Sequence, residues 1–314
     1  MSAIKTRVAL DRVGAFLGET FGGPVSGLAP LRGGEAAQAF GFLVDDQQYV
    51  IRINANSRSF EMDRYEHSHF SSAEIPIPEI IQVGNFDENL HYAISRRLRG
   101  RLVDELSGEE HARPLPHLIQ TLDAIHQIDV RSQGLYGEWD EDGEAHLDSW
   151  QQYILSIKDR VPYGTDWRSL FETSSMEPSL VERTYDRISE LVEYCPEEIS
   201  LIHGDFGSDN VLAKDGRITG VLDWGGSKYG DFLYDVAWLI FWSDRYDAGT
   251  FKKHFQSLDT PIFHFQERLF CYQIPIGLGV AGFFAGSEQK ERYMWARDRV
   301  SSLLDAGLSP GALQ

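Results

Sequence analysis

Length, composition and charge limit what the chain can be. It has 314 residues, 42% of them hydrophobic and 25% charged, and at about 100–200 residues per domain it predicts two domains or one domain in two lobes. Its formal net charge of −19 repels phosphate groups, which excludes nucleic acid and anionic membranes as partners. The excess acid either favours a cationic partner or serves solubility alone.

A strand-rich block occupies residues 28–98, preceded by an amphipathic helix over residues 7–22 that ends at a Gly-Gly-Pro signal. Apolar, alternating runs predict its strands, and Pro76 and Pro78 end its helix. The predicted elements are strands over 38–44 and 48–53, a helix over 60–72, and strands over 80–85 and 91–96.

The chain after Gly100 is mostly helical. Residues 117–128 carry apolar side chains at helical spacing, whereas the acidic, glycine-containing residues 131–148 are expected to form a surface excursion. Further helices are predicted over 149–158, 179–194, 232–242, 250–257, 263–285 and 289–305, and short strands over 199–202, 211–213 and 219–223.

These elements predict an α+β fold in two lobes. A small N-lobe spans residues 1–98, a hinge lies near 95–100, and a larger, mostly helical C-lobe spans residues 99–314. The two cysteines, Cys195 and Cys271, are too few for a disulfide framework or a zinc ribbon, and no run of 18 apolar residues occurs. We therefore expect a cytoplasmic monomer without membrane contact.

The most informative stretch reads H-G-D-x-x-x-x-N and follows an apolar strand. It places His203, Asp205 and Asn210 in one loop, and the next strand pair delivers Asp223. Phosphoryl transfer needs an Asp that orients the attacking hydroxyl, and an amide and a carboxylate that hold magnesium against the nucleotide phosphates. An ordinary hairpin with capping Asp and Asn residues is the alternative, which the combined spacing disfavours.

The stretch 203–210 with Leu222-Asp223-Trp224 resembles the Brenner-type motif of the aminoglycoside phosphotransferase family, relatives of the eukaryotic-like protein kinases. Residues 63–80, 94–100 and 203–242 are most similar to its hygromycin-type members. The resemblance implies a protein-kinase-like fold whose N-lobe holds a small antiparallel sheet. It also implies transfer of the γ-phosphoryl group of ATP or GTP, with Mg²⁺, to a hydroxyl of a cationic aminoglycoside, and hence antibiotic resistance.

Carried over residue by residue, the resemblance assigns roles in the C-lobe. Asp205 is the implied catalytic base, Asn210 and Asp223 are implied magnesium ligands, and His203 braces the catalytic loop. In the following G-D-x-x-x-D segment we expect structural roles. Asp231 is expected to cap the helix that starts near Phe232, and Asp235 is expected to tie that helix to the catalytic loop.

The N-lobe is expected to bind the nucleotide. A loop at Gly33 and Gly34 would cover the phosphates, with Gln38 or backbone N–H groups in contact, because Ala37 stands where relatives often have Ser. Arg52 stands where most of the superfamily has a phosphate-binding Lys, and the alternative is an exposed strand charge.

Arg52 requires a carboxylate partner on the following helix. Asp63 is favoured by position, and Glu66, nearly one turn on, is the alternative. Arg96 and Leu98 are assigned to the hinge, where the family's backbone groups read the adenine edge.

The acceptor site is expected in the C-lobe. Acidic side chains can pair with ammonium groups, and aromatic rings can stack on sugar faces. The candidates are Asp209, Trp238, Trp242, Tyr246 and Tyr272, with the core of the lobe as the alternative place for each aromatic ring. Rival functions are a kinase for another small alcohol (choline, homoserine, a macrolide or a sugar) and a pseudokinase-like binding module.

Overall fold

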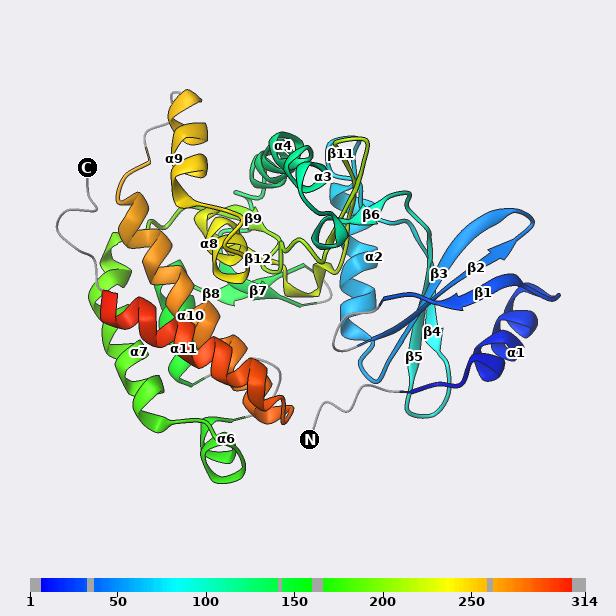
Figure 1. Ribbon diagram of the computed structural model, residues 1–314, viewed down its shortest axis with the longest axis horizontal. Helices are drawn as coiled ribbons and strands as arrows, with labels where there is room; N and C mark the ends of the chain where they lie inside the picture. Colours follow the sequence, from blue (N-terminus) through cyan, green and yellow to red (C-terminus); the bar gives the residue numbers. More distant parts are fainter. Residues whose placement is uncertain (1–6, 33–36, 141–142, 160–165, 259–261, 307–314) are drawn as a thin grey trace.

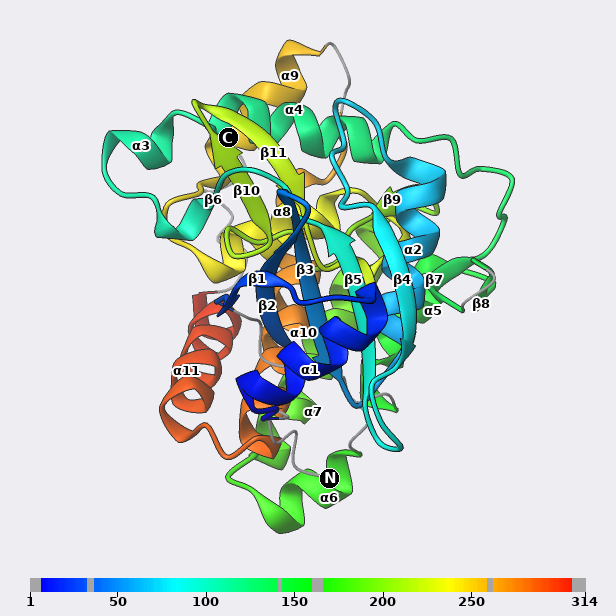
Figure 2. The same cartoon turned by 90° about the vertical axis from the view of Figure 1, so that its right-hand side faces the viewer.

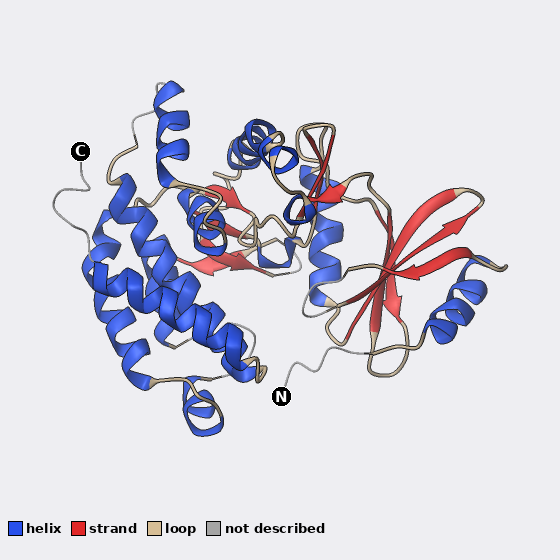
Figure 3. Cartoon of the chain, in the orientation of Figure 1, coloured by secondary structure: helices blue, strands red, loops and turns tan. Residues whose placement is uncertain are grey.

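The structure is a computed structural model, and it describes residues 7–32, 37–140, 143–159, 166–258 and 262–306. Two parts of different composition are visible along the long axis of the molecule. One is built around an antiparallel sheet and the other mainly from helices (Figures 1 and 3). The chain therefore has the two-lobed α+β architecture that its sequence predicts.

The N-terminal part is a five-stranded antiparallel sheet with the strand order β1-β2-β3-β5-β4. Asp45 and Asp46 both take positive φ angles of 47° and 64° in the tight turn between β2 and β3, a conformation that Asp tolerates better than most residues. The strands are β1 (Ser26–Pro30), β2 (Gln38–Val44), β3 (Gln47–Asn54), β4 (Ile80–Asn85) and β5 (His91–Arg96).

Two helices flank this sheet. Helix α1 (Leu10–Phe21) lies across its outer face, where Val13 and Leu17 are fully buried against Phe40 and Ile51 (Figure 2). Helix α2 (Arg58–Phe70) lies on the side of the sheet that faces the rest of the molecule, and its Met62 belongs to the larger core of the C-terminal part. Helix α2 therefore connects the sheet to the part of the chain that carries the catalytic motif.

Two small sheets lie at the start of the C-terminal part. The first has the order β11-β10-β6 and is formed by β6 (Arg101–Leu102), β10 (Val211–Lys214) and β11 (Arg217–Val221). The second has the order β8-β7-β12-β9 and is formed by β7 (Tyr136–Trp139), β8 (Ala145–Leu147), β9 (Ser200–Ile202) and β12 (Lys228–Gly230).

The prediction of a surface excursion over residues 131–148 is therefore wrong for the strands β7 and β8. Tyr136, Trp139 and Ala145 are buried in the core, and β7 pairs with β12. Each of these strands has only three or four residues, so neither presents an alternating pattern long enough to detect. The same shortness hid β12, and α6 (Trp167–Thr173) was also not predicted.

Helices form the rest of the C-terminal part (Figure 1). They are α3 (Glu109–Ala112), α4 (Leu115–His126), α5 (Trp150–Leu155), α7 (Pro178–Leu191), α8 (Leu233–Trp242), α9 (Ala248–Ser257), α10 (Phe265–Gly286) and α11 (Lys290–Ala306). Among the described residues, α10 is the one helix long and apolar enough to cross a membrane, yet 89% of its apolar window is buried within the fold. It is therefore the central helix of the core.

Candidate active site

The catalytic motif forms a loop between β9 and β10. Hydrogen bonds from the first residues of this loop to a side chain of α8 fix its start. Asp235 on α8 accepts hydrogen bonds from the backbone N–H groups of His203 (3.0 Å) and Gly204 (2.8 Å), and it contacts His126 Nε2 at 3.0 Å. Burial alone would raise the pKa of Asp235, but the hydrogen bond and charge of His126, with the backbone donor at Gly204, lower it. Asp235 is thus a buried carboxylate that ties α8 to the loop.

His203 braces the same loop from inside. Its ring is fully buried, with Nε2 3.0 Å from the carbonyl oxygen of Leu222 and Nδ1 accepting the backbone N–H of Asp205 at 3.2 Å. Burial lowers the pKa of His203 to about 4, so the ring is neutral near pH 7. The histidine therefore links the catalytic loop to the strand that precedes Asp223, and it carries no charge into the site.

Asp205 and Asn210 are joined by their side chains. Asn210 Nδ2 donates to the carboxylate Oδ2 of Asp205 at 2.9 Å and to its backbone oxygen at 3.0 Å. Burial and the charges of Asp223 and Asp209 raise the pKa of Asp205, while the hydrogen bond from Asn210 and the charge of Lys228 lower it. The carboxylate is therefore fixed in orientation and surrounded by other acids.

Asp223 completes the group at the end of β11. It takes a left-handed conformation (φ 59°, ψ 66°) immediately before the 3-10 turn Trp224–Gly226. The backbone N–H of Leu222 donates to the carbonyl of Asn210 at 2.8 Å, so the segment before Asp223 is fastened to the catalytic loop. The structure thus brings together Asp205, Asn210 and Asp223, as their spacing predicted.

These side chains fit a magnesium ion that is shared with a nucleotide. The described residues contain no group of three or more His, Cys, Asp and Glu side chains able to hold a metal by themselves. Mg²⁺ prefers oxygen ligands and commonly takes one or two from the protein and the rest from substrate phosphates and water. Asn210 and Asp223 would supply such a pair of oxygen ligands.

An ion pair joins the sheet to this site. Arg52 on β3 pairs with the carboxylate of Asp63 on α2, and the other oxygen of Asp63 accepts the backbone N–H of Trp224 at 3.0 Å. Burial would lower the pKa of Arg52, but Asp63 and Asp223 raise it. Glu66, the alternative partner, is fully buried beside Ser227, and its pKa is raised well above the usual range by burial.

The remaining N-lobe candidates have different outcomes. Gly33 and Gly34 lie outside the described residues. The side-chain amide of Gln38 is hydrogen-bonded through both its oxygen and its nitrogen to the backbone of Val8 (2.8 and 3.4 Å), so it is engaged within the fold. The backbone N–H of Arg96 donates to Glu79 and its side chain pairs with the same residue, which leaves that N–H engaged within the fold.

Leu98 lines a cavity of about 790 Å³ beside the hinge. Asp205, Asn210 and Asp223 do not belong to the lining of this cavity. The positively charged residues along its wall are Arg97, Arg99, Arg101, Arg113 and Lys214. The lining also contains the acids Glu110 and Asp215, so basic residues outnumber acidic ones in this cavity.

Three of the residues predicted to bind the acceptor, Asp209, Trp238 and Tyr246, lie at the catalytic loop. A Cβ atom on Gly207 would lie 2.4 Å from Asp209 Oδ1 and 3.9 Å from Trp238 Nε1, so both side chains converge on this residue. The Tyr246 hydroxyl is 2.9 Å from the Ser208 hydroxyl. Trp242 is half-buried one turn beyond Trp238 on α8.

Three residues near the predicted acceptor site were not identified from the sequence: Trp295, Asp104 and Arg32. Trp295 on α11 stacks on Trp242 with ring centroids 5.4 Å apart, and it remains 38% exposed. Asp104 donates its backbone N–H to Ser208 (3.0 Å) and pairs with Arg32 of the N-terminal part at 2.6 Å. These contacts join segments far apart in the sequence, and no local pattern signals them.

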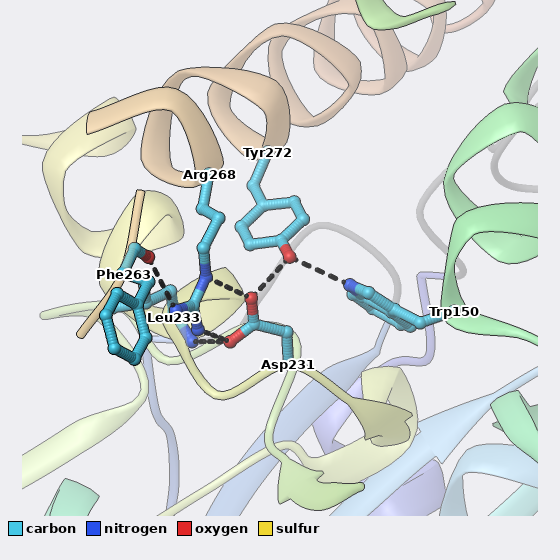
Figure 4. A network of polar contacts seen from close by, with 6 residues as sticks. All are labelled: Trp150, Asp231, Leu233, Phe263, Arg268 and Tyr272. Carbon is cyan, nitrogen blue, oxygen red and sulfur yellow. Dashed lines mark hydrogen bonds and ion pairs between the residues drawn. The ribbon is translucent and has the colours of Figure 1, made fainter. Parts of the chain in front are cut away.

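The assignment of Tyr272 to the acceptor wall is wrong. Its ring is fully buried in α10, its hydroxyl donates to Asp231 and it accepts the indole N–H of Trp150 at 3.0 Å (Figure 4). Arg268 makes a two-pronged ion pair with the same carboxylate at 2.6 and 2.8 Å. Tyr272 therefore belongs to a buried network that anchors α10.

Asp231 lies at the centre of this network (Figure 4). One of its oxygens accepts the backbone N–H of Leu233 at 3.1 Å, which satisfies a free donor at the start of α8. Because Arg268 and Tyr272 bind the same carboxylate, Asp231 connects the start of α8 to α10. Its contacts agree with the structural role expected from the sequence.

Gly204 gives a test of the packing beneath the loop. It has φ 77°, and a Cβ atom there would lie 2.1 Å from the carbonyl oxygen of Gly226 and 2.5 Å from Lys228 Nζ. We expect Gly204→Ala to lower the free energy of unfolding by about 2 kcal/mol or more. Gly216→Ala is the matched control, because Gly216 has the same φ of 77° and its nearest neighbour would be 3.7 Å away. Chemical denaturation of both variants checks this, and equal losses would contradict it.

Residues 27–266 match the phosphotransferase enzyme family. The chain is 32% identical over 303 residues to the hygromycin-B 4-O-kinase of Escherichia coli. The aligned region covers 96% of this chain and 87% of that protein. It is also 26% identical over 242 residues to a homoserine kinase of Polaromonas naphthalenivorans, covering 74% of this chain and 71% of that protein.

Solved structures agree with the sequence matches. A thermostable mutant of aminoglycoside phosphotransferase APH(4)-Ia, in ternary complex with AMP-PNP and hygromycin B, superposes with a TM-score of 0.82 at 33% identity over 95% of this chain and 99% of that one. A GDP and kanamycin complex of an APH(2″) enzyme superposes with a TM-score of 0.68 at 14% identity, over 96% of this chain and 100% of that one, and it supports the fold alone. The fold is protein-kinase-like, and the chain belongs to the phosphotransferase enzyme family.

Proposed function

We propose that the chain transfers the γ-phosphoryl group of a nucleoside triphosphate, with Mg²⁺, to a hydroxyl of a cationic aminoglycoside of the hygromycin B type. The observation that carries this proposal is the group formed by Asp205 and Asn210, in the loop between β9 and β10, and Asp223, just after β11. The similarity over 96% of the chain to a hygromycin-B 4-O-kinase supports the choice of acceptor. Such a reaction inactivates the antibiotic and would confer resistance.

In this proposal Asp205 is the residue that meets the acceptor. Its carboxylate, held by Asn210, orients the hydroxyl toward the γ-phosphorus and accepts the proton as the new oxygen–phosphorus bond forms. The bond between the γ-phosphorus and the bridging oxygen breaks, and the nucleoside diphosphate leaves with that electron pair. Magnesium at Asn210 and Asp223 would neutralise charge on the phosphates.

Residues 1–98 would then form the nucleotide-binding lobe, and residues 99–314 the catalytic and acceptor-binding lobe. Arg52 would contact the phosphates, because its pair with Asp63 directs the guanidinium toward the edge that carries Asp223. Asp63 also accepts the Trp224 N–H, so one carboxylate aligns the phosphate-binding arginine and the magnesium-binding segment together.

The acceptor would bind on the acidic side of the catalytic loop. Asp209 and Asp104 lie close enough for the charge of Asp104 to raise the pKa of Asp209, after the larger effect of burial. Trp238 and the stacked pair Trp242 and Trp295 provide aromatic faces nearby. Acidic groups beside aromatic faces suit an amino-sugar, which carries ammonium groups on an apolar ring face.

We expect Asp209→Asn to raise the acceptor KM about tenfold and to leave the nucleotide KM within about twofold, since it removes one charge from the acceptor side. The wild-type acceptor KM should rise with salt, because the Debye length falls from about 10 Å at 0.1 M to about 3 Å at 1 M. Steady-state kinetics with hygromycin B at several NaCl concentrations measures both effects.

Asp186→Asn is the control for this experiment, because Asp186 is an exposed acid on α7, a helix that lies apart from β9, the strand that leads into the catalytic loop (Figure 1). An acceptor KM that is equally unaffected in both variants would remove Asp209 from the acceptor site. Homoserine should be included as a neutral-side-chain acceptor, because a homoserine kinase is among the relatives. Turnover of homoserine without turnover of any aminoglycoside would replace the proposed function by the rival one.

A further inference from the structure

Lys228 is a buried cation on β12, and its side chain packs against the start of the catalytic loop. Its side chain is 4% exposed, and its strand lies between β9 and β7, where Lys228 is the partner of Ile202 and Glu138. Ile202 is the residue that leads into His203, so the lysine sits in the strand beside the one that delivers the loop. A fully buried lysine is rare in proteins unless its charge is used or paired.

The ammonium group of Lys228 lies against the backbone turn at Gly204. Lys228 Nζ lies 2.5 Å from the point that a Cβ atom on Gly204 would occupy, so it contacts the backbone between His203 and Asp205. The rings of Tyr234 and Tyr153 lie 5.0 and 5.9 Å from Nζ. Cation–π contacts of this kind stabilise a desolvated ammonium only in part.

Glu138 lies opposite the lysine on β7, but no ion pair within 4 Å joins Lys228 to a carboxylate of the described residues. Desolvating an ammonium group costs several kcal/mol, and a methionine of similar length would fill the same space without that cost. A side chain that served packing alone would therefore be better apolar. The buried charge needs another explanation.

The negative charges around Asp205 explain why a buried positive charge is useful at Lys228. Asp205 is acted on by the like charges of Asp223 and Asp209, and the phosphates of a bound nucleotide would add more negative charge on the same side. Lys228 contributes an opposite, positive charge, and its Nζ lies against the backbone of Gly204, the residue before Asp205. In a buried site with low effective dielectric, one such charge acts strongly over a few ångströms.

We infer that Lys228 is a positioning residue for phosphoryl transfer, whose buried positive charge holds the Gly204 turn and stabilises the Asp205 carboxylate against the neighbouring acids and the incoming phosphates. The inference rests on the proposed role of Asp205 as the base. Lys228 itself touches neither substrate, since its side chain is buried beneath the loop.

The test is Lys228→Met, which keeps the length of the side chain and removes its charge. We expect kcat to fall roughly tenfold or more, while the KM values for nucleotide and acceptor stay within about twofold. The melting temperature should be unchanged or higher, because the desolvated charge is gone. The loss of kcat should persist at high salt, since buried charges are screened little.

Further variants separate charge from shape. Lys228→Gln should lose as much kcat as Lys228→Met, because it restores polarity without charge, and Lys228→Arg should recover part of the loss if its larger group is accommodated. Lys158→Met is the control: this exposed lysine also lies over a tyrosine ring, 4.5 Å from that of Tyr185, and its removal should leave kcat unchanged.

A wild-type kcat in Lys228→Met, or a loss of kcat only in proportion to a loss of folded protein, would overturn the inference. A kcat restored in Lys228→Gln would also overturn it, because charge would then not be the cause. Asp205→Ala in the same assay keeps the two proposals apart. If Asp205→Ala is inactive and Lys228→Met is fully active, the inference about Lys228 fails and the proposed base stands.

Discussion

Asp205→Ala is expected to lower kcat by roughly 10²-fold or more, because it removes the group that orients the acceptor hydroxyl and accepts its proton. Asn210 would lose its side-chain partner, yet the loop should persist, since Asp235 holds the backbone of His203 and Gly204 independently of Asp205. Nucleotide affinity should change little. Steady-state kinetics together with a fluorescent-nucleotide titration measures both quantities.

Asp205→Asn is the companion variant, because it keeps the shape of the side chain and loses only the charge. It should be nearly as slow as Asp205→Ala, whereas Asp186→Ala, on the exposed side of α7, should be as active as the wild type. A kcat near normal in both Asp205 variants, with intact melting temperatures, would show that another group accepts the proton.

Asp223→Asn and Asn210→Ala are expected to raise the magnesium concentration needed for half-maximal activity by about tenfold or more and to slow the reaction. Each change removes or weakens one of the two oxygen ligands that the chain can offer to the ion. Asp223→Asn also removes a charge that raises the pKa of Asp205, so it should ease ionisation of the base while it weakens the metal site.

A magnesium titration of activity in both variants checks this, with Asp186→Asn as the charge-matched control. Because high magnesium can refill a weakened site, activity should recover partly at saturating metal. Titration curves that coincide with the wild-type curve in both variants would show that neither residue holds the ion.

Much of the N-terminal sheet could be predicted from sequence because its strands are long and bounded by turn residues. β2, β4 and β5 have the predicted bounds, and the paired aspartates at 45 and 46 mark the hairpin. β7 and β8 escaped detection because each has only three or four residues, and the acidic, glycine-containing residues around them resemble a loop.

The residues of the candidate site also fall into two groups, those that local sequence could identify and those that it could not. Asp205, Asn210 and Asp223 were recognisable because their roles require fixed residue types at short spacing. Local sequence favoured Asp63 but left Glu66, three residues further along the same helix, as an alternative. The contacts with Arg52 and the Trp224 N–H identify Asp63. Long-range packing decides such choices.

The acceptor wall was the least predictable part for the same reason. Tyr272 lies on α10, which is buried on nearly all sides, so periodicity cannot tell which ring faces the cleft and which joins an internal network. Trp295 was missed because only the packing of α11 beside α8 brings it onto Trp242. Lys228 was also missed, since an isolated lysine in a short strand carries no signal of burial.

In the proposed reaction the chain transfers a phosphoryl group from a nucleotide to an aminoglycoside hydroxyl, with Asp205 as the base. The most direct measurement is mass spectrometry of hygromycin B after incubation with ATP, MgCl₂ and either the wild-type protein or Asp205→Ala. We expect a singly phosphorylated antibiotic and an equal amount of ADP with the wild type, and almost none of either product with the variant. Unmodified hygromycin B together with phosphorylation of a neutral alcohol such as homoserine would contradict it.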